Sequence, residues 1–262
     1  MGTALVTGAS AGLGLEFAWQ LATARHDVVL VARDVARLER LAGQLNAAAG
    51  VRAEVLPADL SERGDVERVA ERLRQAEHPV GLLVNNAGYS TGDSFLGSDL
   101  DFQERALDVM VRAVMVLSHE AATAMLARGR GAILNVSSVA ALTTAGTYSA
   151  HKAWVRVFTE GLATELRGTG VTATALCPGL THTEFHERAG VDRSRYPDIA
   201  WLNADAVVSA ALADVRRGAV ISTPSLRYGV ISEVARLLPR SAIRRFSDSP
   251  AMHVTSSDDG QD

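Results

Sequence analysis

The stretch "ALVTGASAGLGLEFAWQLA", residues 4–22, begins as an apolar, β-rich run and ends as a helical pattern. Gly8, Gly12 and Gly14 fall in the joint, spaced G-x-x-x-G-x-G. Glycines there allow a tight turn and a close backbone approach to a pyrophosphate, while the following helix offers free N–H groups and a partial positive charge. The stretch therefore predicts a dinucleotide phosphate site. A plain strand-to-helix turn is the alternative.

The rest of the chain alternates in the same way between short apolar runs and helical patterns. Residues 34–49 illustrate the helices, because Asp34 can cap the N-terminus while Leu38, Leu41 and Leu45 repeat on one face. Apolar strands separated by helices predict a doubly wound α/β fold, in which helices cover both faces of a parallel sheet and ligands bind at the carboxyl ends of the strands. The seven predicted strands are 4–7, 27–32, 52–58, 81–85, 131–137, 170–177 and 218–223.

Composition narrows the class of protein. The chain has 262 residues, 47% of them apolar, and a formal net charge of −4, which gives no sign of nucleic-acid binding. Cys177 is the only cysteine, so no intrachain disulfide can form. We find no signal peptide and no apolar run long enough to cross a bilayer. We therefore expect a cytoplasmic protein.

One domain is expected to span residues 1–246, because no linker or repeat divides the chain. Residues 247–262 are polar and aperiodic, which predicts a loose, disordered tail. Residues 226–246 are apolar with several arginines, and we expect a helix packed on the body or on a partner subunit. A membrane-surface helix is the alternative, which we rank lower.

Tyr148 and Lys152 stand four residues apart in "GTYSAHK", residues 146–152. On a helix this spacing stacks their side chains on one face. An ammonium beside a phenol favours the phenolate and lowers its pKa from about 10, so that the phenol can exchange protons near neutral pH. The ordinary alternative is that such a pair lies on the protein surface and has no catalytic role.

Five segments together resemble the short-chain dehydrogenase/reductase family in their order and approximate spacing. They are "TGASAGLG" (7–14), "NNAG" (85–88), "NVSS" (135–138), "YSAHK" (148–152) and "CPG" (177–179). The resemblance covers the chain to about residue 222. It implies a Rossmann-type fold, a nicotinamide cofactor, and hydride transfer between that cofactor and a carbonyl or alcohol.

The resemblance also assigns catalytic roles. It implies that Ser138 polarises the carbonyl, that Tyr148 donates the proton, and that Lys152 lowers the pKa of Tyr148 and holds the nicotinamide ribose. Only ten positions separate Ser138 from Tyr148, where relatives commonly show about thirteen, so residues 139–147 are a shortened, pocket-lining loop. Ser137 is the alternative serine.

Residues at the end of the second strand favour NADP(H) over NAD(H). Ala32 occupies the place where NAD-preferring relatives carry an acid, and the fork of Arg33 suits a 2′-phosphate. A solvated loop arginine is the alternative for Arg33. Asp59 is expected at the adenine by resemblance, or else as a turn residue before a helix near Ser61.

The full cofactor site implied by the resemblance includes glycine-loop, strand-end and catalytic residues. Asn86, Ala87 and Gly88 could instead form only a tight turn. Thr183 is a further, weaker candidate. The predicted site comprises Gly8, Ser10, Gly12, Leu13, Gly14, Arg33, Asp59, Leu60, Asn86, Ala87, Gly88, Tyr148, Lys152, Pro178, Gly179 and Thr181.

One departure from the family pattern leaves function open. Met110 stands where many relatives carry an asparagine that anchors a proton-relay water, and methionine cannot replace the hydrogen bonds of an amide. A core methionine is the ordinary interpretation. The leading hypothesis is an NADP-dependent enzyme that interconverts a ketone and a secondary alcohol. The alternatives are a non-catalytic NADP-binding sensor or regulator and, ranked last, a membrane-surface scaffold.

Several other residues receive weaker interpretations. His182 and His186 have helical metal-ligand spacing, but no third ligand is evident, so we expect no metal. Arg188, Arg193 and Arg195 could meet an anionic substrate. Tyr89, Leu142, Trp154 and Trp201 could line an apolar pocket or belong to the core. Helices near 101–128 and 147–167 are the usual subunit faces in the family, so we expect a homodimer or homotetramer whose partners are small carbonyl or alcohol substrates.

Overall fold

The computed structural model describes residues 2–91, 95–184 and 197–247. Seven strands form one parallel sheet in the order β3-β2-β1-β4-β5-β6-β7, which confirms the predicted doubly wound, Rossmann-type fold. The strand order reverses between β1 and β4, so the carboxyl ends of these two strands border the ligand crevice. The strands are β1 Thr3–Thr7, β2 Asp27–Ala32, β3 Ala53–Pro57, β4 Val80–Asn85, β5 Gly131–Val136, β6 Val171–Leu176 and β7 Ile221–Ser222.

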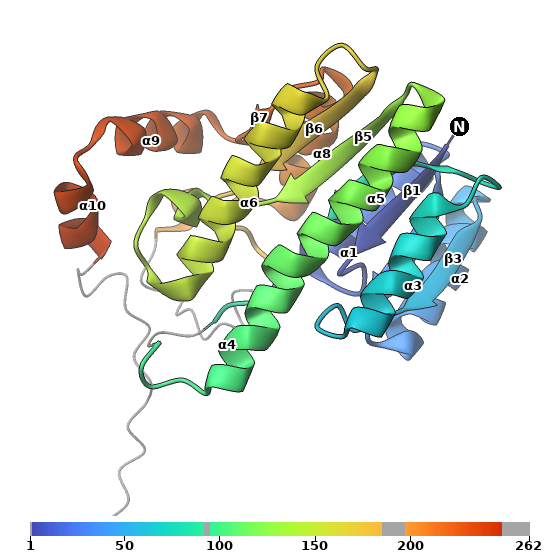
Figure 1. The fold of residues 1–262 in the computed structure, drawn as a ribbon, viewed down its shortest axis with the longest axis horizontal. Helices are drawn as coiled ribbons and strands as arrows, with labels where there is room; N and C mark the ends of the chain where they lie inside the picture. The colour runs from blue at the N-terminus through green and yellow to red at the C-terminus, as the bar shows by residue number, and fades with distance from the viewer. Residues whose placement is uncertain (1, 92–94, 185–196, 248–262) are drawn as a thin grey trace, which may run out of the picture.

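Helices cover both faces of the sheet (Figure 1). On one face, α1 (Gly12–Thr23), α2 (Val35–Ala49) and α8 (Ala204–Arg216) pack over a core cluster that includes Val6, Leu30 and Leu134. On the other face, α3 (Arg63–Arg74), α5 (Ala113–Arg128) and α6 (Gly146–Glu165) lie over the sheet, in a cluster that includes Leu5, Leu83 and Ile133. The sheet is therefore the middle layer of three.

Helix α2 follows its sequence prediction closely. The Asp34 side chain accepts a hydrogen bond from the Arg37 N–H at 3.0 Å, so it caps the helix. Leu38, Leu41 and Leu45 are all buried. The cap and the apolar spacing thus fixed this helix locally.

A continuous helical run from Leu100 to Arg128 contains a π-helical segment. It consists of α4 (Leu100–Leu107), η1 (Asp108–Arg112) and α5. By length and hydropathy alone this is the one helix in the described ranges that could cross a membrane. Half of its apolar window is buried, and Met110, Leu117 and Met125 are fully enclosed, so packing on the sheet accounts for its apolar character.

Two predicted boundaries are wrong at the C-terminal end. Strand β7 has only two residues, because 218–220 belong to the turn after α8, where Gly218 adopts φ +68°. The helix predicted over 226–246 is two helices, α9 (Leu226–Leu237) and α10 (Arg240–Ser247). Leu238 between them is extended, as a residue before proline prefers to be, and Pro239 cannot continue α9. The predicted tail from 248 onward lies outside the described residues.

The start of α1 packs so closely on the end of β1 that a side chain cannot fit. A Cβ on Gly14 would lie 2.1 Å from the Gly8 carbonyl oxygen and 2.5 Å from the Asn86 amide nitrogen. The Asn86 amide donates to the Thr7 carbonyl at 2.9 Å, and the Thr7 hydroxyl accepts from the Asn86 and Ala87 N–H groups at 2.9 and 3.0 Å. These bonds tie the glycine loop to the end of β4.

We predict that Gly14→Ala lowers the free energy of unfolding by about 2 kcal/mol, because the added methyl must displace backbone rather than a flexible side chain. Urea unfolding provides the measurement. Gly43→Ala is the matched control, because nothing lies within 4 Å of its Cβ position in α2, and there alanine should stabilise by about 0.5–1 kcal/mol. Equal effects at the two sites would contradict the packing argument.

Candidate active site

The loop between β1 and α1 has the properties of a phosphate cradle. The N-cap position of α1 is Ala11, and within the described chain no side chain caps the first N–H groups of the helix. Gly8 and Gly12 adopt φ +67° and +55°, which other residues rarely adopt. Ser10 and Leu13 lie half-buried in the same joint. Free N–H groups at a helix N-terminus and a backbone open to close approach fit a pyrophosphate.

The segment after β6 reaches back over this cradle. The Cβ atom of Thr183 lies 3.4 Å from the Cβ position of Gly12, which places Thr183 against the glycine loop. Thr181 is buried and donates to the Gly179 carbonyl at 3.0 Å, while the Pro178 carbonyl accepts from the Val139 N–H at 3.0 Å. The predicted residues after β6 therefore border both the cradle and the loop after β5.

At the carboxyl end of β2, Arg33 and Asp59 face each other. A guanidinium nitrogen of Arg33 lies 3.7 Å from a carboxylate oxygen of Asp59, and 75% of the Arg33 side chain is exposed. Asp59 also accepts from the N–H and the hydroxyl of Ser61 at 3.0 and 2.7 Å, so its turn role is confirmed. Leu60 beside it is buried. The guanidinium of Arg33 remains accessible to an anion from solvent.

At the end of β4, Gly88 lies between two side chains of the predicted site. Its Cβ position is 3.3 Å from the Met110 sulfur and 3.4 Å from the Lys152 Nζ. Met110 is fully buried in the π-helical segment η1, as the core-methionine interpretation predicts. The Met110 thioether therefore borders the space near the lysine.

Ser138, Tyr148 and Lys152 converge at the carboxyl ends of the central strands. Ser138 follows β5, and its side chain lies close enough to that of Tyr148, near the start of α6, to lower the pKa of the phenol. The Lys152 Nζ lies 5.7 Å from the centroid of the Tyr148 ring and donates to the Val136 carbonyl at 2.8 Å. The structure thus brings together the three residues predicted to be catalytic. The alternative Ser137 is buried and donates to the Lys152 carbonyl at 2.7 Å, which is a structural contact.

The prediction that Lys152 lowers the pKa of Tyr148 is wrong in the structure. Burial raises the pKa of Tyr148 to about 12, and the neighbouring Ser138 side chain opposes this only in part. Burial also lowers the pKa of Lys152 to about 8. Both shifts arise because removing a side chain from water disfavours its charged form, and here desolvation outweighs the expected attraction between ammonium and phenolate.

A polar cluster that sequence reasoning missed positions the start of α6. The Tyr148 N–H donates to the Thr91 hydroxyl at 3.0 Å. The Thr147 hydroxyl bonds to that of Thr91 at 2.9 Å and to the side-chain amide oxygen of Gln103 at 2.5 Å. Thr91 and Gln103 are buried. Neither is near Tyr148 in sequence. The sequence did offer one signal for such contacts. Ala145 at the N-cap of α6 has no side-chain acceptor, so groups from elsewhere in the chain must bind the first N–H groups of the helix.

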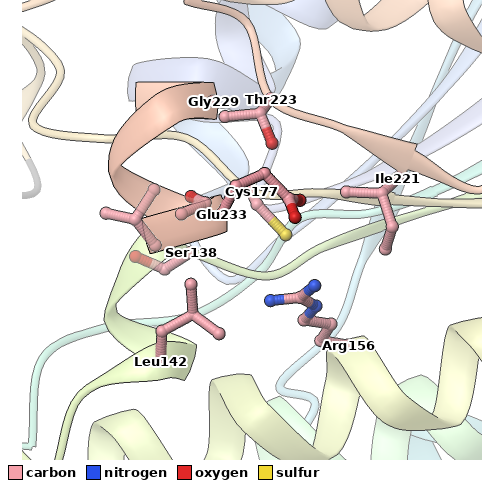
Figure 2. Close-up of a pocket in the computed structure, with 10 residues that line it drawn as sticks. Ser138, Leu142, Arg156, Cys177, Ile221, Thr223, Gly229 and Glu233 are labelled. Carbon is pink, nitrogen blue, oxygen red and sulfur yellow. The ribbon is translucent and has the colours of Figure 1, made fainter. Parts of the chain in front are cut away.

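A cavity of about 160 Å³ opens behind Ser138 (Figure 2). Ser138 and Leu142 line it on one side, and the Arg156 guanidinium points from α6 toward the Cys177 sulfur. Helix α9 closes it with Gly229, Ser232 and Glu233. Neither Tyr148 nor Lys152 lines this cavity, which is therefore adjacent to the candidate site and not identical with it.

The weaker sequence candidates have mixed outcomes. Leu142 lines the cavity as predicted, but Trp154 stacks on Phe158 at 4.7 Å and Trp201 on His182 at 5.2 Å. Tyr89 packs against Phe102 at 5.4 Å. His186, Arg188, Arg193 and Arg195 lie outside the described residues. Within those residues, no three acidic, histidine or cysteine side chains gather as metal ligands would.

Comparison with known proteins identifies the family. The short chain dehydrogenase model matches residues 2–193. A solved short-chain dehydrogenase from Sphingobium yanoikuyae, in complex with NADPH, is 34% identical and superposes with a TM-score of 0.83 over 95% of this chain and 99% of that one. Galactitol 2-dehydrogenase (L-tagatose-forming) from Cereibacter sphaeroides is 35% identical over 70% of this chain and 72% of its own length. A short chain dehydrogenase of Pseudocercospora fijiensis is 35% identical over 70% of this chain, and the match spans 60% of that protein.

The chain therefore belongs to the short chain dehydrogenase family, whose members are oxidoreductases that use a nicotinamide cofactor. Its glycine cradle fits the pyrophosphate of such a cofactor.

We predict that Lys152 makes stability depend on pH between about 8 and 10. The folded protein releases the Lys152 proton near pH 8, whereas the unfolded chain keeps it to about 10.5. The unfolded state thus binds more protons in this window, so the free energy of unfolding should rise with pH relative to Lys152→Met. Tyr148 acts in the opposite sense, but only above pH 10. Urea unfolding at several pH values tests this. Curves that stay parallel would show that Lys152 keeps its proton.

Proposed function

We propose that this protein is an NADP-dependent oxidoreductase that interconverts a ketone and a secondary alcohol. The observation that carries the proposal is the convergence of Ser138, Tyr148 and buried Lys152 at the carboxyl ends of the strands, next to the glycine cradle. A proton donor and a second hydrogen-bond donor on one side of a crevice match what carbonyl reduction requires.

The roles of the residues follow from the charge that develops. Reduction builds negative charge on the carbonyl oxygen, and the bound reduced nicotinamide supplies the hydride. Ser138 donates a hydrogen bond to that oxygen, and Tyr148 donates a proton to it. Lys152, whose Nζ donates to the Val136 carbonyl, is proposed to bind the nicotinamide ribose.

The raised pKa of Tyr148 keeps the phenol protonated, which is the form that carbonyl reduction requires. A phenol with a pKa of about 12 is protonated at neutral pH, so it is ready to donate. The oxidative direction needs the phenolate, which burial disfavours.

The preference for NADP rests on Arg33. Its guanidinium is exposed at the end of β2, and Ala32 offers no carboxylate to a ribose hydroxyl. The NADPH in the Sphingobium yanoikuyae structure supports the same cofactor. Asp59 neutralises part of the charge on Arg33, and a 2′-phosphate would compete with it.

We further propose that the protein acts in the cytoplasm as a homo-oligomer on small-molecule substrates. The faces of α5 and α6 expose the apolar side chains of Met115 and Val157, which suits a subunit contact. Galactitol dehydrogenation by a relative supports a small alcohol or carbonyl substrate.

Met110 favours a second candidate, a cofactor-binding sensor without turnover. The buried thioether beside Lys152 cannot anchor a relay water as an amide can. NADPH binding without turnover on any substrate would favour the sensor.

We predict that Tyr148→Phe lowers kcat for NADPH-dependent ketone reduction by about 10²–10⁴-fold, because it removes the proton donor. NADPH absorbance with a panel of ketones measures this, and NADPH fluorescence should show retained cofactor binding. Tyr89→Phe, which deletes a phenolic hydroxyl elsewhere in the crevice region, is the control. Turnover that survives in Tyr148→Phe would overturn the mechanism.

We predict that Arg33→Ala raises the Kd for NADPH by about 10–100-fold, the range expected for charge-assisted hydrogen bonds, and changes the Kd for NADH less than about twofold. Fluorescence titration gives both constants. Arg40→Ala removes an exposed arginine from α2, the helix that follows Arg33, and should leave both unchanged. Equal losses for the two cofactors in Arg33→Ala would refute the role of the 2′-phosphate.

A further inference from the structure

Helix α9 leaves most of its large apolar side chains exposed to solvent. Residues at helical spacing present an apolar face to solvent, and we call them the outer stripe. Leu226 is 92% exposed and Leu237 is 86% exposed. The outer stripe consists of Leu226, Val230, Ile231, Val234, Leu237 and Leu238.

The opposite face of α9 holds the helix on the body. The Tyr228 hydroxyl donates to the Ala200 carbonyl at 2.8 Å and accepts from the Leu180 N–H at 3.2 Å. Its ring packs against Gly179, where a Cβ would lie 2.1 Å from it, and Ser232 is buried. The orientation of α9 is thus fixed by polar and aromatic contacts, which leave the outer stripe pointing away.

Arginines accompany the outer stripe. Residues 226–247 contain five arginines and one acidic residue, Glu233, for a net charge of 5 − 1 = +4 on a chain whose total is −4. Arg244 and Arg245 are exposed on α10, and they form no ion pair with the described part of the chain. Figure 1 shows α9 and α10 projecting beyond the β7 edge of the sheet.

We propose that α9 and α10 form a docking surface for an anionic phospholipid bilayer, with the outer stripe in the acyl region and the arginines at the headgroups. Apolar area and basic charge together are the two signals that reversible membrane attachment requires. Long arginine side chains can extend from an apolar face to the phosphates. From the sequence, a membrane-surface helix ranked below a helix packed on the body or on a partner subunit. In the structure the body leaves the outer stripe exposed, although it buries Ile243 of α10.

A second copy of the chain fits this surface less well. A twofold contact would place the same arginine-rich segment of one protomer against that of its partner. Four net positive charges on each side would repel, whereas anionic lipid neutralises them.

The proposed bilayer surface lies next to the cavity behind Ser138. Helix α9 forms one wall of the cavity behind Ser138 through Gly229, Ser232 and Glu233. A bilayer against the outer stripe would therefore lie beside this cavity, separated from it by the width of one helix. Attachment itself does not depend on the proposed enzymatic activity.

Flotation of the full chain with vesicles tests the proposal. We expect flotation with vesicles of phosphatidylcholine mixed with phosphatidylglycerol, little with phosphatidylcholine alone, and loss of binding at high salt. Leu237→Glu should lower the partition coefficient by about tenfold or more, because it replaces a side chain that inserts into the acyl region. Arg244→Gln combined with Arg245→Gln should lower it about tenfold.

Leu96→Glu is the matched control, because Leu96 is 93% exposed in a turn remote in sequence from α9 and should leave flotation unchanged. Circular dichroism checks that each variant folds. Absence of flotation with anionic vesicles would overturn the proposal, as would equal losses in Leu96→Glu and Leu237→Glu. Dissociation of an oligomer by Leu237→Glu, without vesicle binding by the unmodified chain, would assign the surface to a second copy instead.

Discussion

The closest backbone approach at the ligand crevice is between the first turn of α1 and the end of β1. Gly14 lies so near the Gly8 carbonyl and the Asn86 amide that only hydrogen fits at its Cα. This contact places the N-terminus of α1 over the point where the strand order reverses, and Thr7 joins the ends of β1 and β4 there. The N-terminus of α1 therefore sets where the phosphates of a bound dinucleotide can lie in the crevice.

The candidate catalytic residues illustrate how burial and charge compete. The i, i+4 spacing of Tyr148 and Lys152 brings the ammonium near the ring, as helix geometry requires. The same packing buries Lys152 and covers part of Tyr148. The resulting desolvation raises the pKa of the phenol and lowers the pKa of the ammonium, so the neutral form of each group is favoured. Lys152 lies beside Gly88, just after the carboxyl end of β4, where the cofactor is proposed to bind. The charge of a bound cofactor would therefore change both pKa values.

The C-terminal helix α9 is attached to the body through few contacts and leaves an apolar face exposed. Its attachment to the body depends on Tyr228 and on buried Ser232, while most of its large apolar side chains remain in solvent. An apolar stripe of this kind lowers solubility unless something covers it. The fold therefore carries two sites with distinct requirements, a polar crevice at the strand ends and an apolar, basic surface at the sheet edge.

The sequence by itself determined the elements whose signals are local. The strand–glycine–helix pattern of 4–22, the Asp34 cap and the leucine spacing of α2 encode where these strands and helices form, because each depends on neighbours a few residues apart. Tertiary structure alone decided the Thr91–Gln103 contacts that begin α6, the raised pKa of Tyr148 and the outward face of α9. These depend on which surfaces long-range packing covers, and desolvation and exposure are properties of the folded neighbourhood, which no local spacing encodes.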